Sequence, residues 1–452
     1  MGISSLGAGS NILTQDVLDQ LRSVDENQFI KPVTLDIAAE KDKQTQLSSL
    51  RTTMGDLQNS LADLGAGNDY DKRKASVGGD ANVAVSVRSG VAAQSFSLEV
   101  SQLATKEVVQ SGTFSSKTDP IANGSGSLKI NIGDKEYSVD YDEDMSLEDL
   151  ARAINKEAKE SLSATVVQIS DGEFALFLSS KNEGANNQIT MSDEGGNLAD
   201  ASAFTNLTRV QEGQSAIFKY NGVDIQRDSN KVDDLIDGLT LTLNKTGTSE
   251  VNIATDNGAI LKGMQDFTDK FNAALSKLNV LTKASQDADE RGIFSNESVI
   301  KDLRRDLQEL VESAGGGKLG DYGFTMDDKG KLEFNKDIFQ AKLDENPANV
   351  EAFLSGGKFN NGDGTTTDTR GAFNEMLDKV DSYLGTGKIL DEYKKSTDDN
   401  LEMFEDRKKS ATQRLDARYD ILKRQYAAYD SMIAKMQNVS SMFSQMTAAQ
   451  YA

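Results

Sequence analysis

The chain has 452 residues, which is enough for several domains with their own hydrophobic cores. Its 72 acidic and 49 basic residues give a formal net charge of −23, which disfavours binding to nucleic acid and to anionic lipid. Because Cys, His and Trp are absent, disulfides, thiolate metal sites and histidine catalysis are excluded. No stretch approaches the roughly 20 apolar residues that a membrane span needs, so we expect no membrane insertion.

The N-terminal region predicts a flexible leader followed by two helices. Residues 1–12 are uncharged and rich in Ser and Gly, without the basic region and apolar core of a secretory signal. A helix is expected over 12–30, with Leu13, Val17, Leu21 and Val24 on one face. Pro32 should interrupt it, because proline lacks a backbone donor. A second helix is expected over 33–64.

This second helix carries an apolar seam at heptad spacing, which we call the N-terminal coil seam. Its members are Leu47, Leu50, Met54, Leu57, Leu61 and Leu64. We interpret the seam as the inner face of a helical bundle, with a contact to a partner helix as the alternative.

From Ser76 the apolar period changes to two, which predicts antiparallel strands. We assign residues 76–119 plus 205–257 to a β-rich head domain, with a hairpin turn at Asn221-Gly222. Pro120 and the Gly/Ser-rich run after it mark the start of an inserted α+β domain over 120–204.

The inserted domain has clear local signals. Ser146 is placed to cap a helix and Asp149 to complete a capping box. Asp171-Gly172 predicts a hairpin between two strands.

Helical periodicity returns after residue 257. Residues 41–75 plus 258–414 predict a helical-bundle leg domain with a small hairpin at 328–330. We expect the Gly/Asn/Asp/Thr-rich stretch 356–371 to be a loop and one helix to run from about Ala372 to near the end of the chain.

The last helix carries a second seam, the C-terminal seam, whose apolar residues alternate at spacings of four and three. Its members are Leu415, Tyr419, Leu422, Tyr426, Tyr429, Ile433, Met436 and, after a polar position at Ser440, Phe443. Burying each such side chain is worth roughly 1.5–3 kcal/mol, so the seam requires cover from the N-terminal segment or from neighbouring subunits. Residues 1–40 plus 415–452 are therefore predicted to form a terminal coiled-coil domain.

No catalytic constellation emerges, so we expect neither an enzyme nor a cofactor or metal site. Asp363, in an Asn-Gly-Asp-Gly run, comes nearest to a calcium loop, but the later bidentate Glu is missing. The run Gly315-Gly316-Gly317-Lys318 lacks the glycine spacing of a phosphate loop and is interpreted as a hinge between helices. The fold class is α+β multidomain: terminal helices in a coiled-coil or bundle leg, and a β-rich head of two domains, one inserted in the other.

Several segments together resemble the bacterial flagellar filament cap family, also called hook-associated protein 2. The matching segments are residues 2–10, 221–225 with 229–230 and 238–241, 271–272, 292–294, 422–430 and 433–436. The most specific is 422–430 (LKRQYAAYD), although the family usually has Phe and Met where this chain has Tyr426 and Tyr429.

The resemblance implies a non-enzymatic, homo-oligomeric ring at the extracellular tip of the flagellum. Such a ring promotes the folding and insertion of exported flagellin, and hook-associated junction proteins are implied as further partners. It also implies type III export without a cleaved signal peptide, and a cytoplasmic export chaperone. The alternatives are another axial component, such as a hook–filament junction protein or flagellin-like subunit, or a stalked surface adhesin.

Overall fold

A computed structural model describes residues 14–79 and 82–450, with side chains described up to residue 447. The predicted leader 1–12 lies outside these residues. The chain forms two compact units: Met1–Gly67 with Leu261–Ala452, and Asn68–Ile260. Both ends of the chain therefore belong to the same unit, as the two terminal helical patterns predicted.

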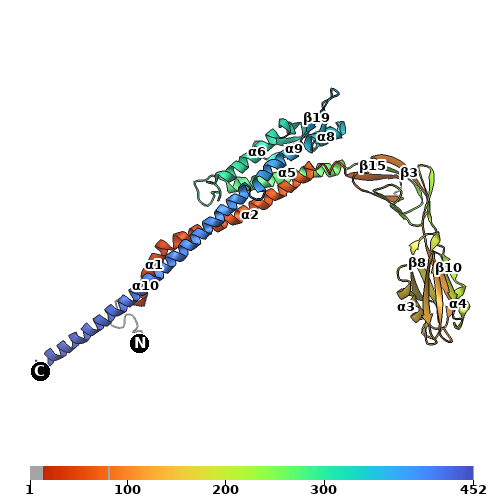
Figure 1. The fold of residues 1–452 in the computed structure, drawn as a ribbon, viewed down its shortest axis with the longest axis horizontal. Helices are drawn as coiled ribbons and strands as arrows, with labels where there is room; N and C mark the ends of the chain where they lie inside the picture. Colours follow the sequence, from red (N-terminus) through yellow and green to blue (C-terminus); the bar gives the residue numbers. More distant parts are fainter. Residues whose placement is uncertain (1–13, 80–81, 451–452) are drawn as a thin grey trace. The chain divides into compact units, whose positions relative to one another are not determined.

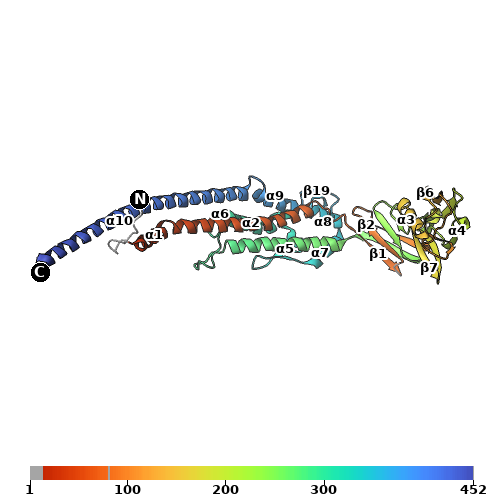
Figure 2. The same cartoon turned by 90° about the horizontal axis from the view of Figure 1, so that it is seen from below.

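The first unit is mainly helical (Figure 1). Its helices are α1 (Gln15–Phe29), α2 (Lys31–Gly65), α5 (Asn257–Leu281), α6 (Ser298–Gly317), α7 (Lys336–Glu345), α8 (Pro347–Leu354), α9 (Ala372–Leu384), α10 (Ile389–Gln450) and the 3-10 helix η2 (Leu319–Tyr322). Two hairpins accompany them: β16 (Phe324–Met326) with β17 (Leu332–Phe334), and β18 (Gly357–Asn360) with β19 (Thr366–Thr369). Figures 1 and 2 both show α2 alongside α10, and α2 also packs on α9.

Helix α1 begins three residues after its predicted start and α2 begins two residues before its own, and α1 buries a different face than predicted. The Thr14 hydroxyl accepts the Val17 amide at the start of α1, and Pro32 lies in the first turn of α2, where a missing donor costs little. The face predicted from Leu21 and Val24 is wrong, because both are exposed and Leu18 is the buried residue. Its fourth member, Leu13, lies outside the described residues.

The core of the first unit combines the N-terminal coil seam with a cluster of phenylalanines. All six seam residues of α2 are buried, as expected for the inner face of a bundle. Phe267 of α5 packs edge-on against Phe373 of α9 with ring centroids 5.0 Å apart, and Phe324 of β16 adds a further edge contact. Rings in such orientations add favourable quadrupole contacts to the burial of their area.

Two predictions in the last third of the chain are wrong. The helix expected from Ala372 to the end is two helices, because the chain leaves α9 at Gly385 and Gly387 takes a positive φ of 69° before α10 begins. The stretch 356–371 contains the β18–β19 hairpin. Its strands are largely exposed and polar, so the sequence has no apolar alternation that would predict them.

The second unit contains all the remaining strands. A five-stranded antiparallel sheet has the order β1-β15-β3-β11-β12, and a three-stranded sheet has the order β13-β14-β2. Their bounds are β1 (Arg73–Gly79), β2 (Val83–Val87), β3 (Gln94–Gln102), β11 (Ala216–Tyr220), β12 (Val223–Arg227), β13 (Lys231–Val232), β14 (Leu239–Leu243) and β15 (Gly247–Thr255). Their inward residues, Phe96, Phe218 and Leu241 among them, share one core, and Asn221-Gly222 forms the predicted β11–β12 turn.

A second core lies between residues 105 and 212 and corresponds to the predicted inserted domain. One sheet has the order β10-β4-β8-β7 and the other β6-β5-β9. The elements are β4 (Lys106–Phe114), β5 (Gly126–Ile132), β6 (Lys135–Tyr141), α3 (Leu147–Glu157), β7 (Leu162–Ser170), β8 (Glu173–Glu183), η1 (Ala185–Asn187), β9 (Ile189–Asp193), α4 (Ala201–Thr205) and β10 (Thr208–Gln211).

The predicted edges of this inserted domain, 120 and 204, are too narrow. Strands β4 and β10 lie outside those edges, yet β4 pairs with both β8 and β10. Because these strands are hydrogen-bonded in one sheet, the inserted domain extends from Lys106 to Gln211. Pro120 and the Gly/Ser-rich run lie in the loop after β4, so the domain start predicted from them falls too late in the chain. The α3 capping box is present as predicted: Ser146 Oγ accepts the Asp149 amide, and the Asp149 carboxylate accepts the Ser146 amide.

Candidate assembly interface

The C-terminal seam begins as an intramolecular contact between α10 and α1. Leu415 and Tyr419 are buried against Leu18 of α1. Leu422 and Tyr426 are partly buried against the same cluster. The N-terminal segment therefore covers the first part of the seam, which is one of the two kinds of cover predicted from the sequence.

Polar contacts around this cluster fix the register of α10 on α1. Tyr419 Oη donates to Asp25 Oδ2 at 2.9 Å, and Arg418 Nη1 lies 3.1 Å from the same oxygen. Arg22 Nη2 donates to Asp416 Oδ1 at 2.5 Å, with the guanidinium 6.0 Å from the centre of the Tyr419 ring. Burial and then the hydrogen bond to Asp25 raise the pKa of Tyr419, so the phenol stays protonated as a donor.

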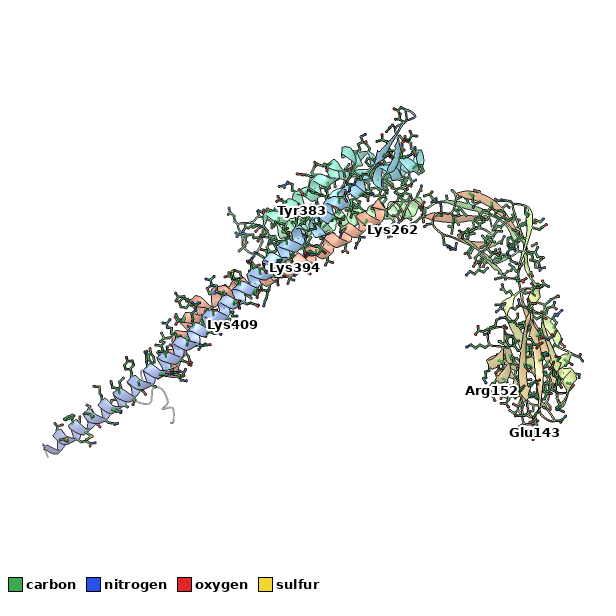
Figure 3. The ribbon with its side chains drawn as sticks, in the orientation of Figure 1. Glu143, Arg152, Lys262, Tyr383, Lys394 and Lys409 are labelled. Atoms are coloured by element: carbon green, nitrogen blue, oxygen red, sulfur yellow. The ribbon has the colours of Figure 1, made fainter. Side chains whose placement is uncertain are left out.

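The start of α10 is held on α2 in the same way. Gln44 Nε2 donates to Asp398 at 2.7 Å, and Arg51 Nη1 lies 3.3 Å from Asp391. The Gly387 amide and the neighbouring Arg51 charge lower the pKa of Asp391. Figure 3 shows Lys394 and Lys409 along α10, and Lys394 pairs with Asp398 one turn later. These contacts make the first half of α10 an integral part of the helical unit.

Exposure rises along the seam towards the C-terminus. Leu415 and Tyr419 are 5% and 7% exposed, whereas Tyr429, Met436 and Phe443 are 56%, 69% and 62% exposed. Ile433 is half-buried. The seam thus consists of an inner part covered by α1 and an outer part whose large apolar side chains face solvent.

The sequence analysis predicted three exposed apolar residues of α10, Tyr429, Met436 and Phe443, but missed Met432, Val439 and Met446 beside them. Tyr429, Met432, Met436, Val439, Phe443 and Met446 alternate at spacings of three and four, and each is more than half exposed. We call these six residues the outer stripe. The outer stripe diverges from the C-terminal seam after Tyr426, because two successive spacings of three residues shift the apolar pattern around the helix. Two successive spacings of three, from Tyr426 to Tyr429 and on to Met432, lead to the outer stripe. Continuing the spacing of the C-terminal seam instead leads to the polar Ser440.

The N-terminal coil seam offers no comparable surface. Leu47, Leu50, Met54, Leu57, Leu61 and Leu64 are at most 3% exposed. They are occupied by the core of their own unit, in contrast to the exposed residues of the outer stripe.

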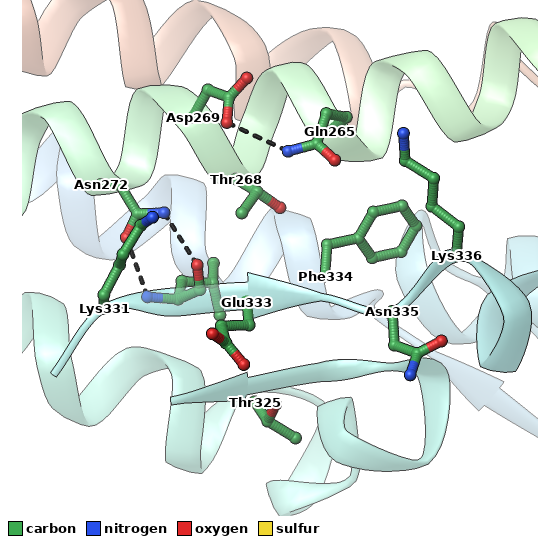
Figure 4. A pocket seen from close by; sticks show the side chains of 11 residues that line it. Gln265, Thr268, Asp269, Asn272, Thr325, Lys331, Glu333, Phe334, Asn335 and Lys336 are labelled. Carbon is green, nitrogen blue, oxygen red and sulfur yellow. Dashed lines mark hydrogen bonds between the residues drawn. The ribbon is translucent and has the colours of Figure 1, made fainter. Parts of the chain in front are cut away.

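One cavity of the helical unit is lined by α5 and the β16–β17 hairpin. Figure 4 shows a cavity of about 520 Å³ between α5 and β17. Its polar groups bind one another: Asn272 donates to the Leu332 carbonyl and accepts the Leu332 amide, both at 2.8 Å. This amide clamp anchors the hairpin to α5.

The two sequence motifs that superficially resemble ligand sites have internal partners. The Asp363 carboxylate accepts the amide and hydroxyl of Thr365, and the Gly315 amide donates to Glu375 at 2.9 Å. The glycines from 315 to 317 all have positive φ, so they turn the chain at the end of α6. Over residues 14–79 and 82–450, no three metal-ligating side chains gather and no helix is long and apolar enough to cross a membrane.

The fold is that of a multidomain α+β protein, in which helices from the first and last parts of the described chain form one unit. Comparisons with known proteins specify it further. The flagellar hook-associated protein 2 C-terminus profile matches residues 213–438, and the N-terminus profile matches residues 10–107. The flagellin hook IN motif matches residues 127–182, within the inserted domain. The chain therefore belongs to the flagellar hook-associated protein 2 family.

Individual relatives agree with this assignment. The flagellar hook-associated protein 2 of Salmonella typhimurium is 27% identical over 99% of this chain and 98% of its own length. That of Campylobacter jejuni is 28% identical, over 78% of this chain but only 64% of the longer relative. The crystal structure of the D1-D2-D3 domains of the flagellar cap protein FliD from Escherichia coli shares the fold, with a TM-score of 0.60 at 21% identity, covering 78% of this chain and 99% of that one. The predicted family and the predicted α+β multidomain fold are confirmed.

Proposed function

We propose that this protein is a non-enzymatic flagellar filament cap, a closed ring of identical subunits at the distal tip of the filament. In this role the ring holds incoming flagellin while the exported chain folds and is inserted, and hook-associated junction proteins are further partners. Membership of the hook-associated protein 2 family supports the flagellar role. The absence of cysteine suits a chain that is exported unfolded through the type III apparatus.

The observation that carries the proposal is the outer stripe of α10. Its six large apolar side chains are each more than half exposed in the single chain. Covering them is worth on the order of 5–10 kcal/mol, which favours association with other helices. Before export, the same stripe requires a cytoplasmic chaperone to keep it from aggregating.

Electron microscopy of the purified full-length protein tests the closed ring. Rings of a few subunits support a cap, whereas open filaments favour a junction protein or a flagellin-like subunit. Particles that stay monomeric and bind a surface ligand would favour the adhesin alternative.

A matched pair of variants tests the role of α10. Ile433→Asp places a negative charge on the C-terminal seam. Ser441→Asp places the same charge on the face of the helix opposite to the outer stripe. We expect Ile433→Asp to abolish ring formation and filament growth while the thermal transition of the second unit stays unchanged. Ser441→Asp should assemble normally. Normal motility with Ile433→Asp would contradict the proposal.

A further inference from the structure

The methionines of this chain fall into groups that differ in burial. Met54, Met191, Met264 and Met376 are buried, at 5% exposure or less, and Met145 and Met326 are half-buried. Among the methionines that the structure describes, the exposed ones all lie on α10: Met403, Met432, Met436, Met442 and Met446, each at least 54% exposed. This distribution is unusual for an apolar side chain and points to the C-terminal part of α10.

Four of these thioethers lie within 15 residues and share one side of the helix. Met432, Met436 and Met446 belong to the outer stripe, and Met442 flanks it beside Phe443. The only charged side chain from residue 432 to 447 is Lys435. The stripe therefore depends on apolar contact for association, and thioether sulfur contributes a large part of its surface.

Thioether sulfur is also the most oxidisable group that the chain contains, since Cys and Trp are absent. A hydroperoxide reacts by attack of a sulfur lone pair on one peroxide oxygen. The O–O bond breaks, an S–O bond forms, and the leaving oxygen departs as water or an alcohol after taking up a proton. Sulfur loses two electrons to the peroxide, and an apolar side chain becomes a polar sulfoxide.

We infer that Met432, Met436, Met442 and Met446 form a peroxide-sensitive modification site that controls assembly. Oxidation places up to four polar sulfoxides on the face that subunits use to associate, so an oxidised chain does not enter the ring. Reduction of the sulfoxides by methionine sulfoxide reductases restores assembly. This inference rests on the proposed assembly function. It adds that the unassembled subunit, rather than the ring with its stripe covered, is the oxidant-sensitive state.

The test uses the full-length protein, hydrogen peroxide and two readouts. Peptide mass spectrometry follows the oxidation of each methionine, and sedimentation velocity follows association before and after treatment. We expect Met432, Met436, Met442 and Met446 to react on the order of tenfold faster than the four buried methionines. Association of the oxidised protein should weaken by about tenfold or more, and reductase treatment should reverse the loss.

Two leucine variants distinguish oxidation of these four methionines from oxidative damage elsewhere in the chain. M432L/M436L/M442L/M446L keeps the apolar volume without sulfur, so peroxide should leave its association unchanged relative to the same variant before treatment. M403L, which removes an exposed methionine outside the stripe, should remain as sensitive as the wild type. Unchanged association after complete oxidation of the four methionines, or equal loss in the quadruple variant, would overturn the inference and leave the ring proposal intact. A wild-type protein that fails to associate even before treatment would instead overturn the ring proposal and this switch with it.

Discussion

The hydroxyl of Tyr419 in α10 donates a hydrogen bond at 2.9 Å to Asp25 in α1, which lies 394 residues away along the chain. The contact lies where the inner part of the C-terminal seam is covered by α1. Beyond it Leu422 and Tyr426 are still partly buried, and from Tyr429 the apolar face of α10 is exposed. Tyr419 thus belongs to the intramolecular packing that precedes the surface we assign to assembly.

Replacing Tyr419 with Phe should loosen α1 from α10 without unfolding the rest of the unit. The expected loss is about 1 kcal/mol, because Asp25 keeps its ion pair with Arg418. Hydrogen exchange of the α1 amides provides the measurement. Tyr426→Phe is the matched control, because this half-buried tyrosine lies on the same seam outside the Asp25 contact. Equal protection of α1 in Tyr419→Phe and the wild type would contradict the role of this bond.

The same tyrosine predicts a loss of α1 docking at alkaline pH. Burial and the Asp25 hydrogen bond raise the folded-state pKa of Tyr419 above its ordinary value of about 10. The corresponding stability is fully present below the unfolded pKa and is lost as pH rises through the folded pKa. Amide exchange in α1 should accelerate above about pH 10 in the wild type, and Tyr419→Phe should lack this component.

Asp306 predicts a contribution to stability that is lost in acid. Burial opposes its ionisation, but hydrogen bonds from Lys379 at 2.8 Å and Tyr383 at 2.6 Å prevail and lower the pKa of Asp306. The contribution is present above the unfolded pKa of about 3.9 and is lost as pH falls through the folded pKa. Asp306→Asn should cost about 1–3 kcal/mol at neutral pH and flatten the acid limb of a denaturation series. Asp302→Asn, which removes a surface ion pair with Arg305, should change stability much less.

The capping box of α3 predicts a local effect on the inserted domain. Ser146→Ala removes the hydroxyl that accepts the Asp149 amide and should cost about 1 kcal/mol. It also removes the hydrogen bonds of the Ser146 hydroxyl, the largest cause of the low pKa of Asp149. Thermal unfolding followed by circular dichroism measures the loss. Ser138→Ala, at an exposed position of β6, is the control and should unfold at the wild-type temperature.

The two seams predict opposite effects of truncation. Leu57→Ala empties a fully buried position in α2 and should destabilise the first unit by about 2–5 kcal/mol. Met436→Ala, at an exposed position, should leave monomer stability within about 0.5 kcal/mol and weaken association instead. Denaturant titration at low protein concentration measures the stability of the monomer alone and so distinguishes a loss of stability from a loss of association. A large loss of monomer stability in Met436→Ala would mean that the outer stripe is already covered within the chain.

Local signals predicted much of the secondary structure. Ser146 with Asp149 marked α3, Asp171-Gly172 and Asn221-Gly222 marked hairpins, and Pro32 marked the start of α2. These features act over a few residues, so chain order alone reveals them. The polar β18–β19 hairpin gave no apolar alternation, and the break near Gly387 was hidden between two helical patterns.

The sequence by itself determined the family, the heptad spacing of both seams and the return of both chain ends to one helical unit. Only the tertiary structure decided which seam residues are already covered. Leu57 and Met436 follow the same kind of spacing, yet one is fully buried in the core and the other is 69% exposed. Periodicity sets the face of a helix on which a side chain lies, whereas exposure depends on which helices, distant in the chain, pack against that face.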